Sequence, residues 1–225
     1  MKKIIILLIT LFFVVKLYSQ ETGKSPVDTK SPLDSEKILQ QKLDTFYKAL
    51  DSLNLNSYEE YTSLEEASKH PDSVFKLVLK RKGYKTFPIE ILKFKNLLVL
   101  NLRNNKISEI PPEIAELKEL RVLTISKNKL TELSSSVCKL KKLIALNASE
   151  NQIETVSRDI ELLQNLQFWD MWGNSLNTLP SEVKNLKKLR FLDLRVISID
   201  EQHKNAIESL LPQARVEFSF NCNCH

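Results

Sequence analysis

The fold is decided by the stretch LLVLNLRNNKI at residues 97–107. Within it Leu100, Asn101 and Leu102 alternate between apolar and polar, which is the period of a β-strand with one buried face. The same arrangement returns every 23 residues. Four columns of equivalent positions are apolar in all six copies, one of them being Leu77, Leu100, Leu123, Leu146, Trp169 and Leu192. A fixed period of this length indicates a protein built from stacked repeats.

A further column holds asparagine in four of the six copies, at Asn105, Asn128, Asn151 and Asn174. Each asparagine follows the strand pattern at the point where the chain must turn inward and leave backbone groups unpaired. A buried unpaired polar group costs about 1–3 kcal/mol, and an amide side chain can both donate and accept hydrogen bonds. We therefore interpret these residues as a structural Asn ladder rather than as ligand contacts.

Residues 97–107 match the pattern L-x-x-L-x-L-x-x-N-x-L, and residues 110–117 read IPPEIAEL. Together they resemble the leucine-rich repeat family, in the 23-residue subtype with an L-P-x-x-I-x-x-L tail. The resemblance covers about residues 74–199, a little over half the chain. It implies an α/β solenoid shaped as a curved right-handed horseshoe, with a parallel sheet on the concave side and short helices on the convex side. It also implies a binding role without naming a ligand.

The physical reason for stacking is that one repeat cannot bury its own leucines. When repeats lie side by side, their strands pair in parallel and the leucines share one continuous core. Each fully buried Leu or Ile contributes roughly 1.5–3 kcal/mol. Several such side chains in every repeat outweigh any single polar contact, so we expect packing to be the main source of stability.

The chain divides by composition into five expected segments: a signal peptide at 1–19, a flexible linker at 20–36, a helical N-terminal cap at 37–73, six repeats at 74–199, and a C-terminal cap and tail at 200–225. Apolar residues recur at helical spacing from Glu36 to Leu53, which predicts an amphipathic helix. Asp200 can cap a final helix that Pro212 stops, and alternation from Arg215 predicts a last edge strand.

The first residues carry two lysines followed by an apolar run from Ile4 to Val15, which is the layout of a secretory signal. The run is too short to span a bilayer comfortably, and an uncleaved membrane anchor is the alternative. We expect an exported protein that is periplasmic, on the cell surface or secreted. Cleavage removes three lysines, so the net charge falls from +5 to +2, which is too weak to indicate nucleic acid as a partner.

The concave surface is the predicted binding site, because the residues between the leucines point toward it. Three aromatic side chains and three charged ones occupy its C-terminal half: Phe168, Trp172, Phe191, Asp170, Asp193 and Arg195. Aromatic residues and arginine dominate binding energy at interfaces. These residues therefore predict recognition of a protein or peptide, with a glycan as the alternative ligand. Packing against the C-terminal cap or another solenoid is the competing structural explanation.

A catalytic role receives little support from the sequence. Three histidines are present, and none lies in a metalloprotease motif; no nucleophile elbow and no phosphate-binding loop occur either. Cys222, Cys224 and His225 could bind a soft metal or exchange disulfides, yet a structural metal site normally uses four ligands. A Cys222–Cys224 disulfide or a disordered tail is the alternative. We expect no enzyme activity, no catalytic residue, no metal and no cofactor.

Overall fold

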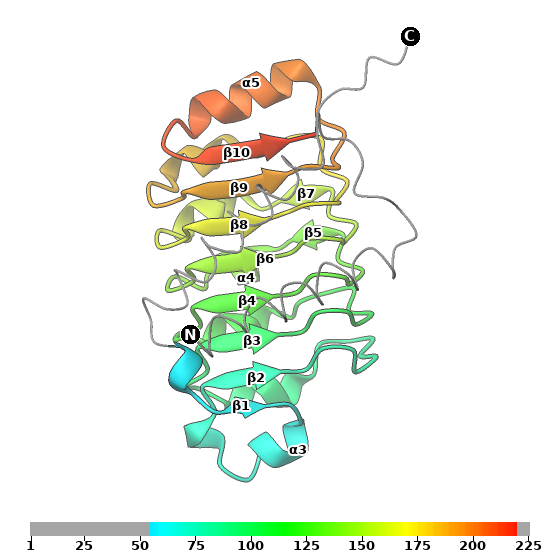
Figure 1. Ribbon diagram of the computed structural model, residues 1–225, viewed down its shortest axis with the longest axis vertical. Helices are drawn as coiled ribbons and strands as arrows, with labels where there is room; N and C mark the ends of the chain where they lie inside the picture. The colour runs from blue at the N-terminus through cyan, green and yellow to red at the C-terminus, as the bar shows by residue number, and fades with distance from the viewer. Residues whose placement is uncertain (1–54, 220–225) are drawn as a thin grey trace, which may run out of the picture. The chain divides into compact units, whose positions relative to one another are not determined.

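The computed structural model describes residues 55–219, which lie within one compact unit. Their main element is an eight-stranded sheet in which every pair of neighbours is parallel. Figure 1 shows the strands stacked one above the other in chain order. They are β1 (Glu60–Tyr61), β2 (Lys76–Val78), β3 (Val99–Asn101), β4 (Val122–Thr124), β6 (Ala145–Asn147), β8 (Phe168–Asp170), β9 (Phe191–Leu194) and β10 (Arg215–Phe218).

Strand pairing follows the repeat, because each residue of β3 to β9 pairs with the residue 23 positions away. The return segments are short helices on the other side of the core. They are η3 (Ile89–Lys93), η4 (Pro112–Glu116), α4 (Ser135–Cys138), η5 (Arg158–Leu162) and η6 (Ser181–Asn185). A small parallel pair of strands, β5 (Glu132–Leu133) and β7 (Thr155–Val156), lies between the sheet and these helices in the chain path.

The core is a continuous cluster between the sheet and the short helices. Leu100, Leu123 and Leu146 lie in neighbouring strands and are fully buried, as the repeat pattern requires. Trp169 occupies the equivalent position in β8 and is also fully buried. Its indole Nε1 has no hydrogen-bond partner, which identifies the ring as a space-filling core residue rather than a ligand contact.

Each repeat passes through one backbone turn in the left-handed region. The residues that adopt positive φ stand 23 positions apart: Arg81, Asn104, Lys127, Glu150, Gly173 and Val196, with φ between 54° and 66°. Gly173 is the only glycine among them, although glycine is the residue that adopts this conformation without steric cost. The turn is therefore imposed by the stacked repeats and not by the local residue.

The asparagine that follows this turn makes the hydrogen bonds of a structural ladder. The Asn128 amide donates to the carbonyls of Leu102 and Ile125 at 3.1 and 2.9 Å, and its oxygen accepts from the Ile107 N–H at 3.0 Å. Asn151 and Asn174 repeat the pattern one and two units further on. Each side chain thus joins two successive repeats while it satisfies buried backbone groups.

The residues before the first repeat strand differ from the expected helical cap. The segment contains η1 (Leu55–Ser57), α3 (Leu64–Ala67) and η2 (Pro71–Ser73), but it also contains strand β1, which extends the sheet by pairing with β2. The Lys76 ammonium lies 2.9 Å from the Glu60 carboxylate across this pair. Residues 37–54 of the predicted cap, the predicted signal peptide and the predicted linker lie outside the described residues.

The end of the sheet is closed by a helix and a strand. Asp200 caps α5 (Glu201–Leu210) by accepting a hydrogen bond from the His203 N–H at 2.8 Å. The chain then returns through Pro212 into β10, which pairs with β9. Figure 1 shows α5 beyond β10 at the end of the stack. Among the described residues, no helix is both long and apolar enough to cross a lipid bilayer.

Val196 is the left-handed residue most strained by its type, because a β-branched side chain disfavours φ of 56°. Its side chain is exposed, so glycine can replace it with little loss of packing. The left-handed conformation costs an L-residue about 1–2 kcal/mol, and glycine avoids this cost. Part of the gain is offset because glycine has more conformational entropy to lose when the chain folds. Val196→Gly should therefore raise the free energy of unfolding by about 0.5–1 kcal/mol in urea titration. Ile89→Gly, at an exposed residue outside the left-handed region, should give no gain.

The Asn ladder can be tested at Asn128. Asn128→Ala removes the partner of several buried backbone groups and should lower the free energy of unfolding by about 1–3 kcal/mol. Asn177 is exposed, and Asn177→Ala should change that free energy by less than about 0.5 kcal/mol. Both values are measured by chemical denaturation followed by circular dichroism. Equal effects of the two substitutions would contradict the structural role of the ladder.

Cys138 provides a test of core accessibility. It ends α4 with a fully buried side chain, and burial, helped by the charge of Asp159, raises the pKa of its thiol to about 12. Because the thiolate is the reactive form, Cys138 should resist iodoacetamide at pH 8 in the native protein and react after unfolding. Peptide mass mapping distinguishes Cys138 from the other two cysteines. Rapid native alkylation at this residue would contradict the packed core.

Candidate functional site

The sheet face turned away from the core is the predicted concave face, and its side chains form three columns across the strands. The pairing register sets them: Val99, Val122, Ala145, Phe168, Phe191 and Arg215 in the first column, and Asn101, Thr124, Asn147, Asp170, Asp193 and Glu217 in the second. The third follows the strand ends and includes Arg103, Ser149, Trp172 and Arg195. The predicted site residues thus lie together in the C-terminal half of this face.

The apolar side chains of the first column are not open to solvent, so the expected exposure of its aromatic rings is wrong. Phe168 and Phe191 are each 3% exposed. Their rings stack with centroids 5.4 Å apart and planes inclined by 10°. The reason is that both rings belong to a second apolar cluster on the concave face, separate from the core. Phe168 and Phe191 therefore do not form an exposed apolar surface for a binding partner.

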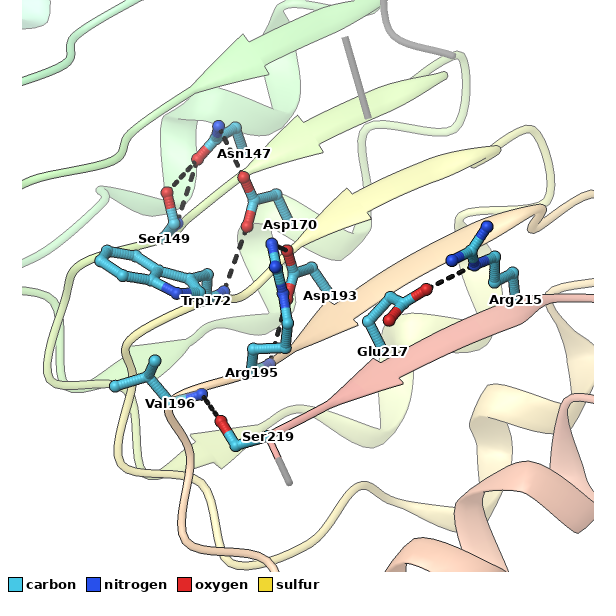
Figure 2. Close-up of polar contacts among 10 residues, drawn as sticks. All are labelled: Asn147, Ser149, Asp170, Trp172, Asp193, Arg195, Val196, Arg215, Glu217 and Ser219. Atoms are coloured by element: carbon cyan, nitrogen blue, oxygen red, sulfur yellow. Dashed lines mark hydrogen bonds and ion pairs between the residues drawn. The ribbon is translucent and has the colours of Figure 1, made fainter. Parts of the chain in front are cut away.

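Four members of the second column are carboxamides or carboxylates that cap the ends of their own strands: Asn101, Asn147, Asp170 and Asp193. Asp170 accepts a hydrogen bond from the Trp172 N–H at 3.1 Å, and Asp193 accepts one from the Arg195 N–H at 3.0 Å. Asn147 does the same for Ser149 and also donates to Asp170 at 3.1 Å. Figure 2 shows these contacts along the strand ends. Asp170 and Asp193 are 5% and 0% exposed, and each accepts a hydrogen bond from the backbone N–H two residues further on.

This capping role is the feature that sequence reasoning missed. The signal is present, because Asn101, Asn147, Asp170 and Asp193 all occupy one column of the repeat. Asn and Asp side chains favour hydrogen bonds to the backbone two residues further on. In Asn101 the oxygen accepts from the Arg103 N–H at 2.9 Å, although no binding role was assigned to that repeat. A position that is Asn or Asp in four of the six repeats is therefore better explained by the turn than by a ligand.

Arg195 is held in place by the last of these acids. Its Nε and Nη2 atoms lie 3.1 and 2.8 Å from the two Asp193 carboxylate oxygens. Burial alone lowers the pKa of Arg195, but hydrogen bonding to Asp193 and the charges of Glu217 and Asp170 outweigh it and raise the pKa. The guanidinium stays charged and its forked geometry is oriented by the carboxylate. On the next strand, the Arg215 Nε atom donates to one carboxylate oxygen of Glu217.

Trp172 directly follows the strand end of β8 and is half-buried. The hydrogen bond from its N–H to Asp170 fixes its backbone, and Gly173 then makes the left-handed turn. Backbone hydrogen bonds join this turn to its two neighbours, from the Glu150 N–H to the Trp172 carbonyl at 2.7 Å and from the Gly173 N–H to the Arg195 carbonyl at 3.0 Å. Trp172 and Arg195 are thus the aromatic and cationic side chains of the predicted site that retain partial solvent contact.

The charged groups of this region are largely engaged by neighbouring groups. Within residues 55–219, no three His, Cys, Asp or Glu side chains gather in a way that could hold a metal ion. The acids nearest the aromatic rings are engaged by backbone N–H groups and by arginine. A rigid edge with an indole, a guanidinium and oriented carboxylates can contact a partner through both apolar and charged groups. The predicted thiol or metal site at Cys222, Cys224 and His225 lies outside the described residues.

Comparison with known proteins agrees with this architecture. A family model described as a leucine-rich repeat region matches residues 78–215. A solved leucine-rich repeat protein of Leptospira interrogans is 34% identical with a TM-score of 0.52, over 60% of this chain and 40% of that one. The functional domain of InlJ from Listeria monocytogenes, which includes a cysteine ladder, is 26% identical with a TM-score of 0.46, over 56% of this chain and 26% of that one. No curated protein matches the sequence.

These solved proteins are longer than the match, since the chain spans less than half the length of either. The family model covers more than half of this chain and includes every repeat strand from the end of β2 to β9. The 23-residue offset between paired strands and the Asn ladder are the structural counterparts of that match. The chain therefore belongs to the leucine-rich repeat family.

Proposed function

We propose that this protein is a non-catalytic binding module that recognises a protein or peptide partner through the C-terminal half of its concave face. The observation that carries the proposal is the position of Trp172 and Arg195, which follow the ends of the neighbouring strands β8 and β9 and keep partial solvent contact. Tryptophan and arginine are the residue types most enriched among interface hot spots. Leucine-rich repeat proteins commonly bind proteins, which supports the same function.

Pre-organisation adds to this support. The backbone of Trp172 is fixed by Asp170, and the guanidinium of Arg195 is oriented by both oxygens of Asp193. Side chains that are already ordered lose less conformational entropy when a partner binds. We therefore assign the direct contacts to Trp172 and Arg195, while Asp170 and Asp193 position them. Phe168 and Phe191 belong to the buried apolar cluster on the same face of the sheet.

The proposed place of action is outside the cytoplasm, in the periplasm, on the cell surface or in the medium. The support is the basic and apolar leader at residues 1–19, which has the layout of an export signal. Mass determination of the N-terminus of protein recovered from culture fractions tests this part of the proposal. An intact Met1 in the cytoplasmic fraction would contradict export.

The binding proposal is tested with displayed random linear peptides as probes. A peptide enriched on the full-length chain should lose at least about tenfold in affinity with Trp172→Ala and with Arg195→Ala, because each removes a contact of hot-spot size. Arg103→Ala is the matched control, since Arg103 stands in the same column at the other end of the solenoid. Affinities are measured by calorimetry, after thermal melts show that the variants fold.

Two outcomes of this experiment would count against a peptide partner. Equal losses for Arg103→Ala and Arg195→Ala would show that the C-terminal half has no special part in binding. Enrichment on a glycan array, with no peptide retained, would assign the same edge to sugars. The commitment of Asp170 and Asp193 to backbone and arginine contacts leaves few free acceptors for sugar hydroxyls, which is why a peptide is preferred.

A further inference from the structure

The turns that follow the first three repeat strands carry a concentration of basic side chains. Residues 80–87, 103–110 and 126–133 together contain eight basic and two acidic residues, which gives a net charge of +6. The equivalent residues of the last three repeats, 149–156, 172–179 and 195–202, contain one basic and four acidic residues, which gives −3. The whole chain carries only +5, so the positive charge is gathered in one half of the solenoid.

The stacked repeats bring these turns together at one edge of the sheet. The Lys106 N–H donates to the Tyr84 carbonyl at 2.8 Å, which ties the second turn to the first. The Lys129 N–H donates to the Ile107 carbonyl at 2.8 Å, which ties the third turn to the second. Because β2, β3 and β4 are parallel neighbours, successive turns stand about 4.8 Å apart. Figure 1 shows the loops after these strands at the same edge of the stack.

Six of these basic side chains are not neutralised by the fold. Among the residues that the structure describes, none of the six makes a side-chain hydrogen bond or an ion pair, and all but the half-buried arginine are exposed. They form the basic turn cluster: Lys80, Lys82, Lys85, Arg103, Lys106 and Lys129. Lysines that precede the strands behave differently. Lys95 pairs with Glu116 at 2.6 Å, and Lys142 pairs with Glu119 at 2.6 Å.

The composition of the basic turn cluster favours a lipid surface over a shaped anionic ligand. Five of its six members are lysines, whose ammonium groups are compact point charges on flexible stems. Arginine, by contrast, is the residue suited to bidentate recognition of one phosphate or carboxylate. The lysines are exposed on turns at the sheet edge, so they can approach an extended surface together. Clusters of about four to eight basic residues are typical of attachment to anionic lipid headgroups.

We propose that the basic turn cluster docks this protein on the surface of a bilayer rich in anionic lipid headgroups. The contact is electrostatic and peripheral, and the solenoid does not enter the hydrocarbon. Trp172 and Arg195 follow β8 and β9, further along the sheet, and belong to a different set of turns. The attachment therefore uses residues separate from those of the proposed binding site, and it does not depend on that function.

Vesicle sedimentation of the full-length chain tests the docking. The protein should bind vesicles that mix phosphatidylglycerol with phosphatidylcholine, and it should bind pure phosphatidylcholine far less. The ratio of the two partition coefficients is the readout, because apolar contacts contribute alike to both vesicles. Sodium chloride at about 1 M, where the Debye length is about 3 Å, should bring this ratio close to one. A wild-type ratio that is already close to one at low salt would overturn the proposal.

Substitutions of lysine locate the charge that matters. Lys82→Gln, Lys106→Gln and Lys129→Gln together should lower the ratio at least about tenfold, since each basic residue near the surface adds to the attraction. The matched control changes three exposed lysines that precede the strands, namely Lys118→Gln, Lys141→Gln and Lys187→Gln. It removes the same charge but should change the ratio by less than about twofold. Equal losses would show that net charge alone acts, and would contradict docking through the turns. Thermal melts establish that both variants fold.

A fluorescent label tests which half of this edge meets the lipid. Ser108 and Asn177 are exposed at equivalent positions of two repeats, one within the basic turns and one in the C-terminal half. With Cys222 and Cys224 replaced by serine and the buried Cys138 retained, a polarity-sensitive dye is attached to Ser108→Cys or to Asn177→Cys. Its emission should shift to shorter wavelength on anionic vesicles at Ser108→Cys only. The same shift at both positions, or a shift at Asn177→Cys alone, would overturn the docking.

Two further measurements separate lipid from other partners. Heparin and polyglutamate are offered to the same variants. If either polymer binds through the three cluster lysines while anionic vesicles do not bind, the lipid assignment is overturned in favour of that polymer. Peptide affinity at the Trp172 and Arg195 edge should be the same in wild type and in the Lys82→Gln, Lys106→Gln, Lys129→Gln variant. Loss of vesicle binding with unchanged peptide binding in that variant supports the docking, and the two proposals can therefore fail independently.

Discussion

The structure depends on the fact that no repeat can bury its leucines without its two neighbours. Leu100, Leu123 and Leu146 are shielded on both sides by the equivalent residues of adjacent strands, so the core exists only as a stack. Asn128 and its equivalents add hydrogen bonds that run from one repeat to the next. The elements at the ends follow from the same need: β1 and β10 extend the sheet, and α5 lies beyond the last repeat.

The repeat also explains what the amino-acid sequence could predict. Register, core positions and the Asn column follow from a 23-residue period that is visible in the sequence, because the same physical environment recurs at each step. The last helix and strand were predictable from Asp200, Pro212 and the alternation after Arg215. Strand β1 was not, since its two residues carry no repeat signature and pair with β2 only in the assembled sheet.

The candidate site was predicted in its location and not in its exposure. Alternation places Phe168 and Phe191 on the concave face, but burial there depends on packing above the sheet, which periodicity does not encode. The roles of Asp170 and Asp193 were obscured for a related reason. Their chemistry suits ligands, while their spacing from the turn suits capping, and only the hydrogen bonds to Trp172 and Arg195 show that capping takes place.

The left-handed turn has a consequence for how such a surface can diversify. Arg81, Asn104, Lys127, Glu150 and Val196 share one backbone conformation despite unrelated side chains, so the scaffold tolerates change at that position. Successive copies stand one strand apart, at increments of about 4.8 Å. Each repeat thus displays one side chain at the rim of the solenoid, and that side chain can differ between repeats while the backbone conformation stays the same. Specificity could be rewritten there one side chain at a time, with the geometry of display held constant.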